Sequence, residues 1–442
     1  MSVNFTRATE GRAVIIDRLP PSLQRFFSAM RGRLSKPQSA HLWGLVLAVA
    51  VNLRQAKLVH LSALTPGGGH RTSRGSFLSR SDWDAPALVE QQAMGLLAAM
   101  KPKPGEVLYL ILDDNRIAKR GRKMGYVSKI WDHKQQKFVR GHIALFAAVA
   151  FRGVVLPWRV ELWKPKGHPG PRYRKLTDMA AAMVKAFRAP EGVKVRVLFD
   201  AFYLCPQVAR ACEGNGFTFF SVAARNRTFT TDGGKGDGKR GRRRGKRKSI
   251  ARLMPEERES AAAPRRLIRH KGRRVRMKRS RGHATLRIAS TDGRLSRIGR
   301  VRMVVSKRPR GPWKKCIAVV TNETGLRPRE VVAIYETRWL IEVLFKELRQ
   351  DLGLADYQMI AEEGILHHLH VCCLAHQMLT HRSLEALGAK AKKPNQQVTP
   401  PPMSNRLRTL RAEIARDQIE RLVPGEQHAQ LRQRLHEYLL AA

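Results

Sequence analysis

Tyr335-Glu-Thr-Arg338-Trp-Leu-Ile-Glu342-Val-Leu-Phe-Lys-Glu-Leu-Arg349 is the stretch of sequence that decides the fold. Because no glycine or proline interrupts residues 331–352, we predict one continuous helix there. On a helix that turns roughly 100° per residue, the four numbered side chains fall at roughly 0°, 300°, 340° and 320°, within one narrow stripe. Apolar side chains fill much of the remaining surface. The helix is therefore expected to be largely buried and to carry one polar seam.

This polar seam has two interpretations. Burying a carboxylate and two guanidinium groups is costly unless they are paired or bind a charged partner. One interpretation is an internal ion pair between Arg338 and Glu342, which lie four residues apart on the helix. The other is a site for a metal ion or a phosphate, formed where an acid and an arginine point toward one place. The helix alone does not decide between them.

The chain carries an unusually large positive charge. Its 442 residues include 84 lysines and arginines against 35 aspartates and glutamates, a formal net charge of +49. Such a charge attracts polyanions and opposes compaction unless a polyanion neutralises it. Nucleic acid is the expected partner, and an anionic membrane surface is the second choice.

The sequence shows no sign of a membrane protein or of a disulfide-rich secreted protein. The apolar run at residues 42–51 is about half the length that a membrane-spanning helix needs. The first residues lack the apolar segment of a signal peptide. Five cysteines, two of them adjacent, do not indicate a disulfide framework. We therefore expect a cytoplasmic protein.

Residues 1–100 are expected to be helical, with segments near residues 21–30, 37–59 and 86–100. Before the last segment, residues 67–80 combine a run of glycines with cations and hydroxyl groups. Such a loop suits contacts with phosphates, and a loop that is merely solvated explains the composition equally well.

From residue 107 the pattern changes to that of a sheet. Residues 107–112 form an apolar run that ends at Asp113 and Asp114, which is typical of a buried central strand. Later segments predict strands at 137–151, 154–163, 193–199 and 217–224, and helices at 173–187 and 206–215. Three strands followed by strands that alternate with helices predict an α/β fold over residues 101–224, with a mixed sheet flanked by helices.

Residues 225–324 interrupt this alternation of strands and helices and contain two basic runs. Residues 225–250 contain eleven lysines and arginines against two aspartates, and residues 265–281 add ten more without an acid. Strand-like pieces around and after these runs predict a β-rich basic insertion before the last core helix. A run of like charge is often only a solvated surface. For these two runs we favour contacts with nucleic-acid phosphates. The arginines expected to make such contacts include Arg242, Arg243 and Arg244.

The rest of the chain is expected to be helical. Residues 325–355 carry the polar seam and complete the core, and residues 356–442 form a C-terminal helical region. In this region a helix to about residue 387 is followed by a proline-containing linker and an amphipathic segment at 404–440. That segment either packs on the body or contacts another protein, and the sequence does not choose.

Three acids are candidates for one metal site. Asp114 and Asp200 each follow a predicted buried strand, and ligands bind beyond the carboxyl ends of strands in open sheets. Two neighbouring carboxylates need a cation between them, and Glu342 provides a third. Three oxygen donors without a cysteine or histidine cluster favour Mg²⁺ or Mn²⁺. Two such ions suit phosphodiester cleavage and transfer.

The helix with the polar seam resembles the signature helix of the bacterial insertion-sequence DDE transposases of the cut-and-paste type. That family carries Tyr-x2-Arg-x3-Glu-x6-Lys, and this chain has Tyr335-x2-Arg338-x3-Glu342-x6-Arg349. The chain departs from the signature at its last position, where arginine replaces lysine. The charge is kept but the geometry is not.

The two aspartate regions are similar to the other acidic motifs of that family. The first is Leu112-Asp-Asp-Asn115, followed by a basic run that begins at Lys119, and asparagine there replaces the usual hydroxyl residue. The second is Leu198-Phe-Asp-Ala-Phe-Tyr203. The resemblance covers about residues 100–355 well. It is less specific for the N-terminal helices, which would correspond to the DNA-binding part.

The resemblance implies a ribonuclease H-like core, with the β insertion before the helix that bears the glutamate. It implies that Asp114, Asp200 and Glu342 are the catalytic, metal-binding triad. Of the two adjacent aspartates, alignment with the motif favours Asp114 over Asp113, which faces the opposite way in a strand. The residues expected to contact DNA are Tyr335, Arg338, Arg349 and Lys119.

The resemblance also implies two Mg²⁺ or Mn²⁺ ions and a homodimer on paired transposon ends in the bacterial nucleoid. The expected partners are the terminal inverted repeats and the target DNA, both double-stranded. Trp313 is a candidate for stacking on a flipped base, although a core tryptophan in the insertion explains it better. Residues 367–376, rich in histidine and cysteine, lack a recognised zinc pattern.

Two other functions compete with an active transposase. One is an inactivated, transposase-derived protein that binds DNA without chemistry. The other is a basic, RNA-associated structural protein, which would explain the charge but not the acids at strand ends. The presence of all three acids and of the complete polar seam favours the enzyme.

Overall fold

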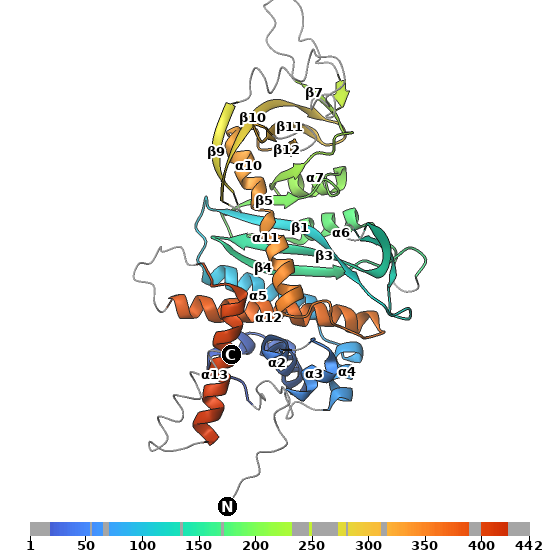
Figure 1. Cartoon of the computed structure of the whole chain (residues 1–442), viewed down its shortest axis with the longest axis vertical. Helices are drawn as coiled ribbons and strands as arrows, with labels where there is room; N and C mark the ends of the chain where they lie inside the picture. Colours follow the sequence, from blue (N-terminus) through green and yellow to red (C-terminus); the bar gives the residue numbers. More distant parts are fainter. Residues whose placement is uncertain are drawn as a thin grey trace, which may run out of the picture.

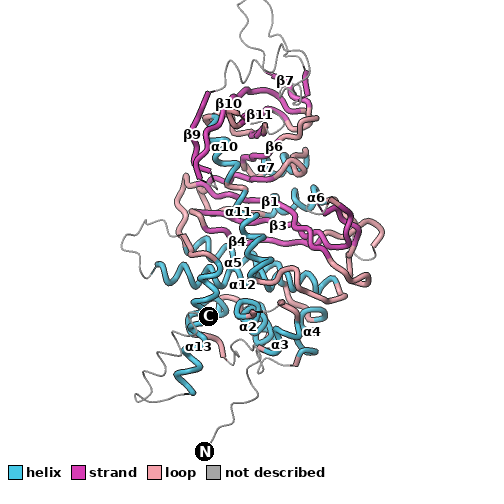
Figure 2. Tube along the Cα trace, viewed as in Figure 1, coloured by secondary structure: helices cyan, strands magenta, loops and turns pink. Residues whose placement is uncertain are grey.

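The computed structural model describes most of the chain. The described residues are 18–53, 55–64, 70–132, 136–168, 172–231, 247–249, 273–279, 282–310, 316–388 and 399–422. In this part the molecule is elongated, with strands of the insertion at one end and the N-terminal and C-terminal helices at the other (Figure 1). The core part of the sheet lies between them, as Figure 2 shows.

The strands of the described part form one continuous sheet. The order of hydrogen-bonded neighbours is β2-β3-β1-β5-β6-β12-β11-β10-β7-β8, with β4 paired to β3 and β9 to β10. The strands are β1 (Val107–Ala118), β2 (Ser128–Asp132), β3 (Lys137–Phe151), β4 (Val154–Leu162), β5 (Lys194–Phe199), β6 (Thr218–Val222), β7 (Thr228–Thr231), β8 (Arg247–Ser249), β9 (Arg273–Arg279), β10 (Gly282–Leu295), β11 (Gly299–Lys307) and β12 (Ile317–Thr321).

The sheet is mixed, as predicted. The strand β5 runs parallel to both of its neighbours, β1 and β6, whereas the pairs β1–β3, β3–β4 and β6–β12 are antiparallel. The ribonuclease H-like α/β fold with flanking helices is confirmed. The insertion is not a separate sheet, because β12 pairs with β6 and carries the core sheet on into β11 and β10.

Helices cover the sheet on both faces and extend beyond it. They are η1 (Pro21–Leu23), α1 (Gln24–Ser28), η2 (Arg31–Arg33), α2 (Lys36–Val51), α3 (Leu58–Ala63), α4 (Arg71–Arg80), α5 (Ala85–Ala99), α6 (Leu176–Ala186), α7 (Pro206–Gly214), α10 (Pro328–Glu336), α11 (Trp339–Lys346), η5 (Glu347–Asp351), α12 (Glu362–Gly388) and α13 (Met403–Leu422). None of the described helices is both long and apolar enough to cross a membrane.

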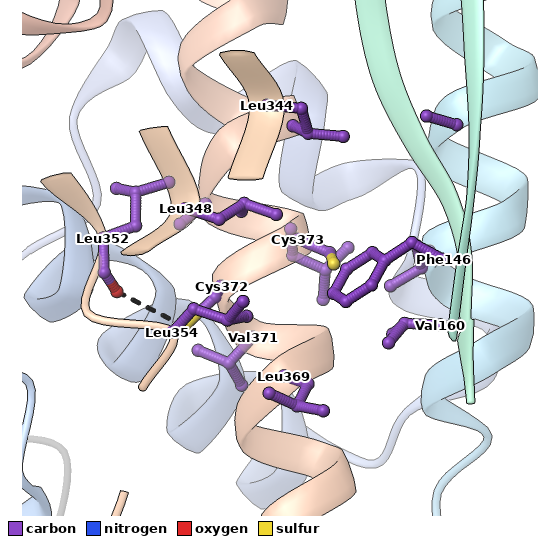
Figure 3. Packing of buried hydrophobic residues seen from close by; sticks show 14 of the residues in the cluster. Phe146, Val160, Leu344, Leu348, Leu352, Leu354, Leu369, Val371, Cys372 and Cys373 are labelled. Atoms are coloured by element: carbon purple, nitrogen blue, oxygen red, sulfur yellow. Dashed lines mark hydrogen bonds between the residues drawn. The ribbon is translucent and has the colours of Figure 1, made fainter. Parts of the chain in front are cut away.

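Two apolar cores hold these layers together, one on each face of the sheet. The helices α6 and α7 pack on one face, and α11 and α12 pack on the other. Figure 3 shows part of the second core, where Leu344 and Leu348 lie with Cys373 of α12 beside Phe146 of β3. The Cys372 thiol donates a hydrogen bond to the carbonyl of Leu352, at 3.3 Å. The segment after α11 is therefore tied to α12.

The predicted single helix over residues 331–352 is wrong in one respect: it is divided into α10, α11 and the π-helical turn η5. At the division, the amides of Thr337 and Arg338 bond to carbonyls three residues back instead of four. The backbone stays in the right-handed helical region but tightens into a 3₁₀-like turn. The stripe calculated for a regular helix therefore does not apply across Arg338.

Two expectations for the N-terminal region are also corrected. The segment predicted as one helix at 37–59 forms two helices, α2 and α3. Residues 71–80, expected as part of a loop, form α4. This helix buries Phe77 and Leu78, and the Arg74 guanidinium donates to the carbonyl of Leu61 on α3. Buried contacts of this kind stabilise a helix whose composition is that of a loop.

Gly353→Ala is expected to lower the midpoint of thermal unfolding by at least about 2 °C. The φ angle of Gly353 is +63°, where a side chain costs about 1–2 kcal/mol. An added methyl carbon would also lie 2.4 Å from the Ala56 Cβ. Gly214→Ala at the end of α7 is the control, since its added methyl would meet nothing within 4 Å. Calorimetry that found Gly353→Ala as stable as wild type would contradict the packing described here.

Candidate active site

The acids of the site are positioned by the parallel pairing of β1 and β5. The register places Leu110 beside Val197 and Ile111 beside Leu198. Continued by two residues, it places Asp113 level with Asp200. Contrary to the prediction, β1 does not end at the two aspartates but runs on to Ala118. Both aspartates of β1 are therefore held by strand geometry.

Strand alternation then separates Asp113 from Asp114. Asp113 shares its face with Ile111, which belongs to the core that α11 covers. Asp114 shares its face with Leu112, which belongs to the core that α6 and α7 cover. Glu342 lies on α11. The strand therefore turns Asp113, and not Asp114, toward the helix that bears the glutamate.

One guanidinium joins the helix to the sheet. The Arg338 Nη1 donates to Asp113 Oδ2 at 2.7 Å, and its Nη2 donates to Glu342 Oε1 at 2.6 Å. The side chains of Arg338, Asp113 and Glu342 are 17%, 18% and 34% exposed. The predicted ion pair between Arg338 and Glu342 is thus present, but it is half of a bridge between two carboxylates.

The electrostatics of this cluster indicate an excess of negative charge. Burial raises the pKa of Asp113, Arg338 opposes this, and the nearby charges of Asp200 and Asp114 add to it, so that the pKa reaches about 7. Burial likewise raises the pKa of Asp200, although the amides of Phe202 and Tyr203 donate to its Oδ1 at 2.9 and 3.4 Å. A single guanidinium does not fully compensate three carboxylates, so this cluster favours an added cation.

Asp114 has other partners. Its Oδ1 accepts a hydrogen bond from the Tyr203 hydroxyl at 2.9 Å, and its Oδ2 lies 3.3 Å from Arg116 Nε. Tyr203 is fully buried in the core beneath α6 and α7. These contacts orient Asp114 toward Tyr203 and Arg116, while its charge still reaches Asp200 and raises the pKa of that carboxyl. The choice of Asp114 over Asp113 therefore stays a prediction.

A hollow of about 320 Å³ opens beside the acids. Its lining includes Asp113, Asp114, Asp200, Phe345 and Arg349. Arg349, on η5, does not point into open solvent: its Nη2 donates to Asn115 Oδ1 and to the carbonyl of Arg116. This residue therefore ties η5 to β1 at the edge of the site. Its predicted contact with DNA stays a prediction.

The donor set fits a hard divalent cation, with one condition. Among the described residues, no three acidic, histidine or cysteine side chains are already gathered closely enough to hold a metal ion. The Arg338 guanidinium stands between Asp113 and Glu342, where a cation would otherwise neutralise them. Asp113, Asp200 and Glu342 are the residues that would hold Mg²⁺ or Mn²⁺ through carboxylate oxygens, with the ion in place of the guanidinium charge.

The structure places the other residues predicted to contact DNA in different surroundings. Tyr335 is half-buried on α10, with the Arg338 guanidinium 6.0 Å from its ring centroid. Lys119 is directed inward: its Nζ donates to the carbonyls of Ala355 and Tyr357, at 2.5 and 2.7 Å. Burial there lowers its pKa to about 8. The phosphate contact predicted for Lys119 is not supported by these bonds.

The predicted residues that lie outside the described part of the chain are Arg242, Arg243, Arg244 and Trp313.

The histidines of α12 are structural in the described part of the chain. His376 pairs with Glu347 of η5 at 3.0 Å, and His368 contacts the carbonyl of Gly353 at 3.1 Å. Burial lowers the pKa of both imidazoles. The sequence does not indicate these partners, because only the fold brings η5 beside α12. The helical spacing of the histidines on an apolar helix was the one available signal.

Comparison with known proteins identifies the family of the chain. Residues 109–378, more than half of the chain, match the family described as "Transposase DDE domain". The chain therefore belongs to the DDE transposase domain family.

One relative makes the similarity more specific. The chain is similar to the "Probable transposase for insertion sequence element IS701" of Microchaete diplosiphon, with 29% identity over 130 residues. The matched stretch is 29% of this chain and 33% of the relative, so the chain spans about a third of the length of this curated relative.

Arg338→Met is expected to destabilise the metal-free protein. It leaves two part-buried carboxylates without their guanidinium, which costs on the order of 2 kcal/mol after allowance for partial exposure. Adding Mn²⁺ should recover much of this loss, because a divalent ion can replace the lost charge. Thermal unfolding in EDTA and in Mn²⁺ measures both effects.

Arg302→Met is the control for this experiment. It breaks an ion pair of similar exposure between Arg302 and Asp292, at 2.7 Å, in the β10–β11 pair. Its loss of stability should not respond to Mn²⁺. An equal response of the two variants to Mn²⁺ would show that the ion does not bind between Asp113 and Glu342.

Proposed function

We propose that this chain is an active DNA transposase that cleaves and joins phosphodiester bonds at the ends of its own insertion sequence. Asp113, Asp200 and Glu342 are the proposed metal-binding catalytic acids. The bridge that Arg338 forms between Asp113 and Glu342, beside Asp200, is the observation that carries this proposal. Family membership and the +49 charge support it.

The proposed chemistry follows from the carboxylates. Bound Mg²⁺ or Mn²⁺, in the proposal two ions, would activate water or a 3′-hydroxyl group and stabilise the leaving oxygen. Asp113 is held by its strand, and Asp200 is held by two backbone amides. Both carboxylates would therefore be oriented before an ion binds. Arg338, released from the two acids, would lie where a phosphate oxygen needs a hydrogen-bond donor.

The same proposal includes the DNA and the assembly. The substrates are the terminal inverted repeats and the target duplex, and a homodimer on paired ends performs cut-and-paste transposition. An inactivated DNA-binding relative would not need the three acids, and an RNA-associated structural protein would not need acids bridged by an arginine. The retained acids and the complete Arg338 bridge favour the enzyme over both alternatives.

Substitutions of single acids test the assignment. Asp113→Asn, Asp200→Asn and Glu342→Gln are each expected to lower Mg²⁺-dependent cleavage at least about a hundredfold, because each removes charge that stabilises the transition state. Asp114→Asn is the matched control and should retain most activity, since Asp114 bonds Tyr203 on the other face. The substrate is duplex DNA from the sequences that flank the gene, and cleavage products are measured on denaturing gels.

Two results would overturn parts of the proposal. Loss of cleavage in Asp114→Asn but not in Asp113→Asn would return the catalytic role to Asp114. Equal cleavage by wild type and all four variants would mean that these acids do not perform the reaction. Binding of the same duplex in EDTA, measured for every variant, separates a catalytic defect from a folding defect.

A further inference from the structure

A groove lies between the N-terminal helices and the end of β1, outside the acidic site. One hollow of about 610 Å³ lies between α3, α4 and residues 357–361. A second hollow of about 740 Å³ lies between residues 118–124, which follow β1, and residues 355–360. The two hollows adjoin, because Lys57, Tyr357 and other residues line both. We call them together the basic groove.

Cations dominate the lining of the basic groove. Apart from Lys119, which is directed inward, they are Lys57, Arg71, Arg80, Arg120, Arg122 and Lys123. All but the half-buried Lys57 are exposed, and within the described part of the chain none of the six makes an ion pair. The lining contains one carboxylate, Asp356, whose Oδ2 is occupied by the amide of Ala56 at 2.7 Å. Six cations gathered without counter-charges indicate a polyanionic partner.

The floor of the basic groove is held in place by buried bonds. The amide of Gly125 donates to the carbonyl of Ile360 at 2.7 Å. The Tyr357 hydroxyl shares a hydrogen bond of 2.8 Å with Nδ1 of the fully buried His142 on β3. The inward-directed Lys119 ammonium binds two carbonyls of the same segment. The cations therefore stand on a fixed surface that connects α3 and α4 to the catalytic sheet.

The basic groove leads to the acidic site along β1. The second hollow and the hollow beside the acids share Ala118. Asp113 and Arg120 are seven residues apart, which corresponds to roughly 24 Å for an extended strand. Phosphates of one DNA strand are spaced about 3.4 Å apart along the helix axis. A duplex that reached from the groove to the acids would therefore span roughly seven base pairs between them.

We propose that the basic groove binds the phosphate backbone of duplex DNA about seven base pairs from the bond that is cut. This inference rests on the proposed function, because the acidic site supplies the reacting end of the path. Arg120, Arg122 and Lys123 contact phosphates next to the catalytic sheet. Arg71 and Arg80, on α4, contact the same duplex farther from the reacting end.

The test compares Arg122→Ala/Lys123→Ala with wild type by fluorescence anisotropy. The probe is a labelled duplex of about 40 base pairs, roughly four helical turns, in EDTA. Each lost phosphate contact reduces the slope of log affinity against log salt concentration by about 0.9. The double variant should therefore reduce the magnitude of the slope by roughly two. Both side chains are exposed, so the fold should not depend on them.

The control is needed because a chain of +49 charge binds DNA weakly over much of its surface. Lys185→Ala/Arg210→Ala removes two exposed cations from α6 and α7, on the opposite face of the sheet. Its slope should stay within about 0.5 of wild type, less than one phosphate contact. Equal slopes for the two double variants would overturn the proposal. So would a loss of affinity by Arg122→Ala/Lys123→Ala for an RNA duplex of the same sequence without a loss for DNA.

A kinetic measurement separates this inference from the proposed function. With Mn²⁺, the groove variant should raise KM for duplex DNA and leave kcat unchanged, whereas Glu342→Gln lowers kcat and leaves the EDTA affinity unchanged. A lowered kcat with unchanged KM in the groove variant would assign these cations to the reacting centre instead. If wild type cut no DNA at all, the proposed function would fail, and the salt slopes would still decide whether the groove binds DNA.

Discussion

The site depends on one cation placed between two carboxylates. Arg338 holds Asp113 of the sheet and Glu342 of the helix together, at 2.7 and 2.6 Å. Without positive charge there, two part-buried acids would repel each other next to Asp200. The guanidinium supplies this charge, so the geometry is stable without a bound ion.

The backbone around Arg338 serves this contact. The tightened turn at Thr337 and Arg338 changes the direction of the side chains between α10 and α11. The π-helical turn η5 then brings Arg349 against β1 and Glu347 against His376 of α12. Irregular turns of this kind carry a conformational cost that the surrounding core must offset. The apolar contacts of α11 and η5 with α12 and β3 offset it here.

The sequence predicted the architecture better than the side-chain contacts. Long apolar runs predicted β3 and β4 to within a residue, because no other element buries such a run next to a two-residue turn. The choice of Asp114 over Asp113 stays a prediction. Because β1 is buried on both faces, its apolar pattern does not show which side faces α11. The loop expected at residues 71–80 failed because the burial of Phe77 and Arg74 outweighs local composition. The inward position of Lys119 depends on a segment more than two hundred residues away.

The junction of β6 with β12 has a consequence for where the insertion begins and ends. Val222 and Val319 are direct neighbours across this antiparallel pair, so their Cα atoms are only about 4.5–5.5 Å apart. The polypeptide thus leaves the central layer and returns almost a hundred positions later at an adjacent point. A short hairpin could close that gap without moving either strand. The insertion therefore begins and ends at one point of the sheet, although α10, which leads into Arg338, packs on its strands β9, β10 and β11.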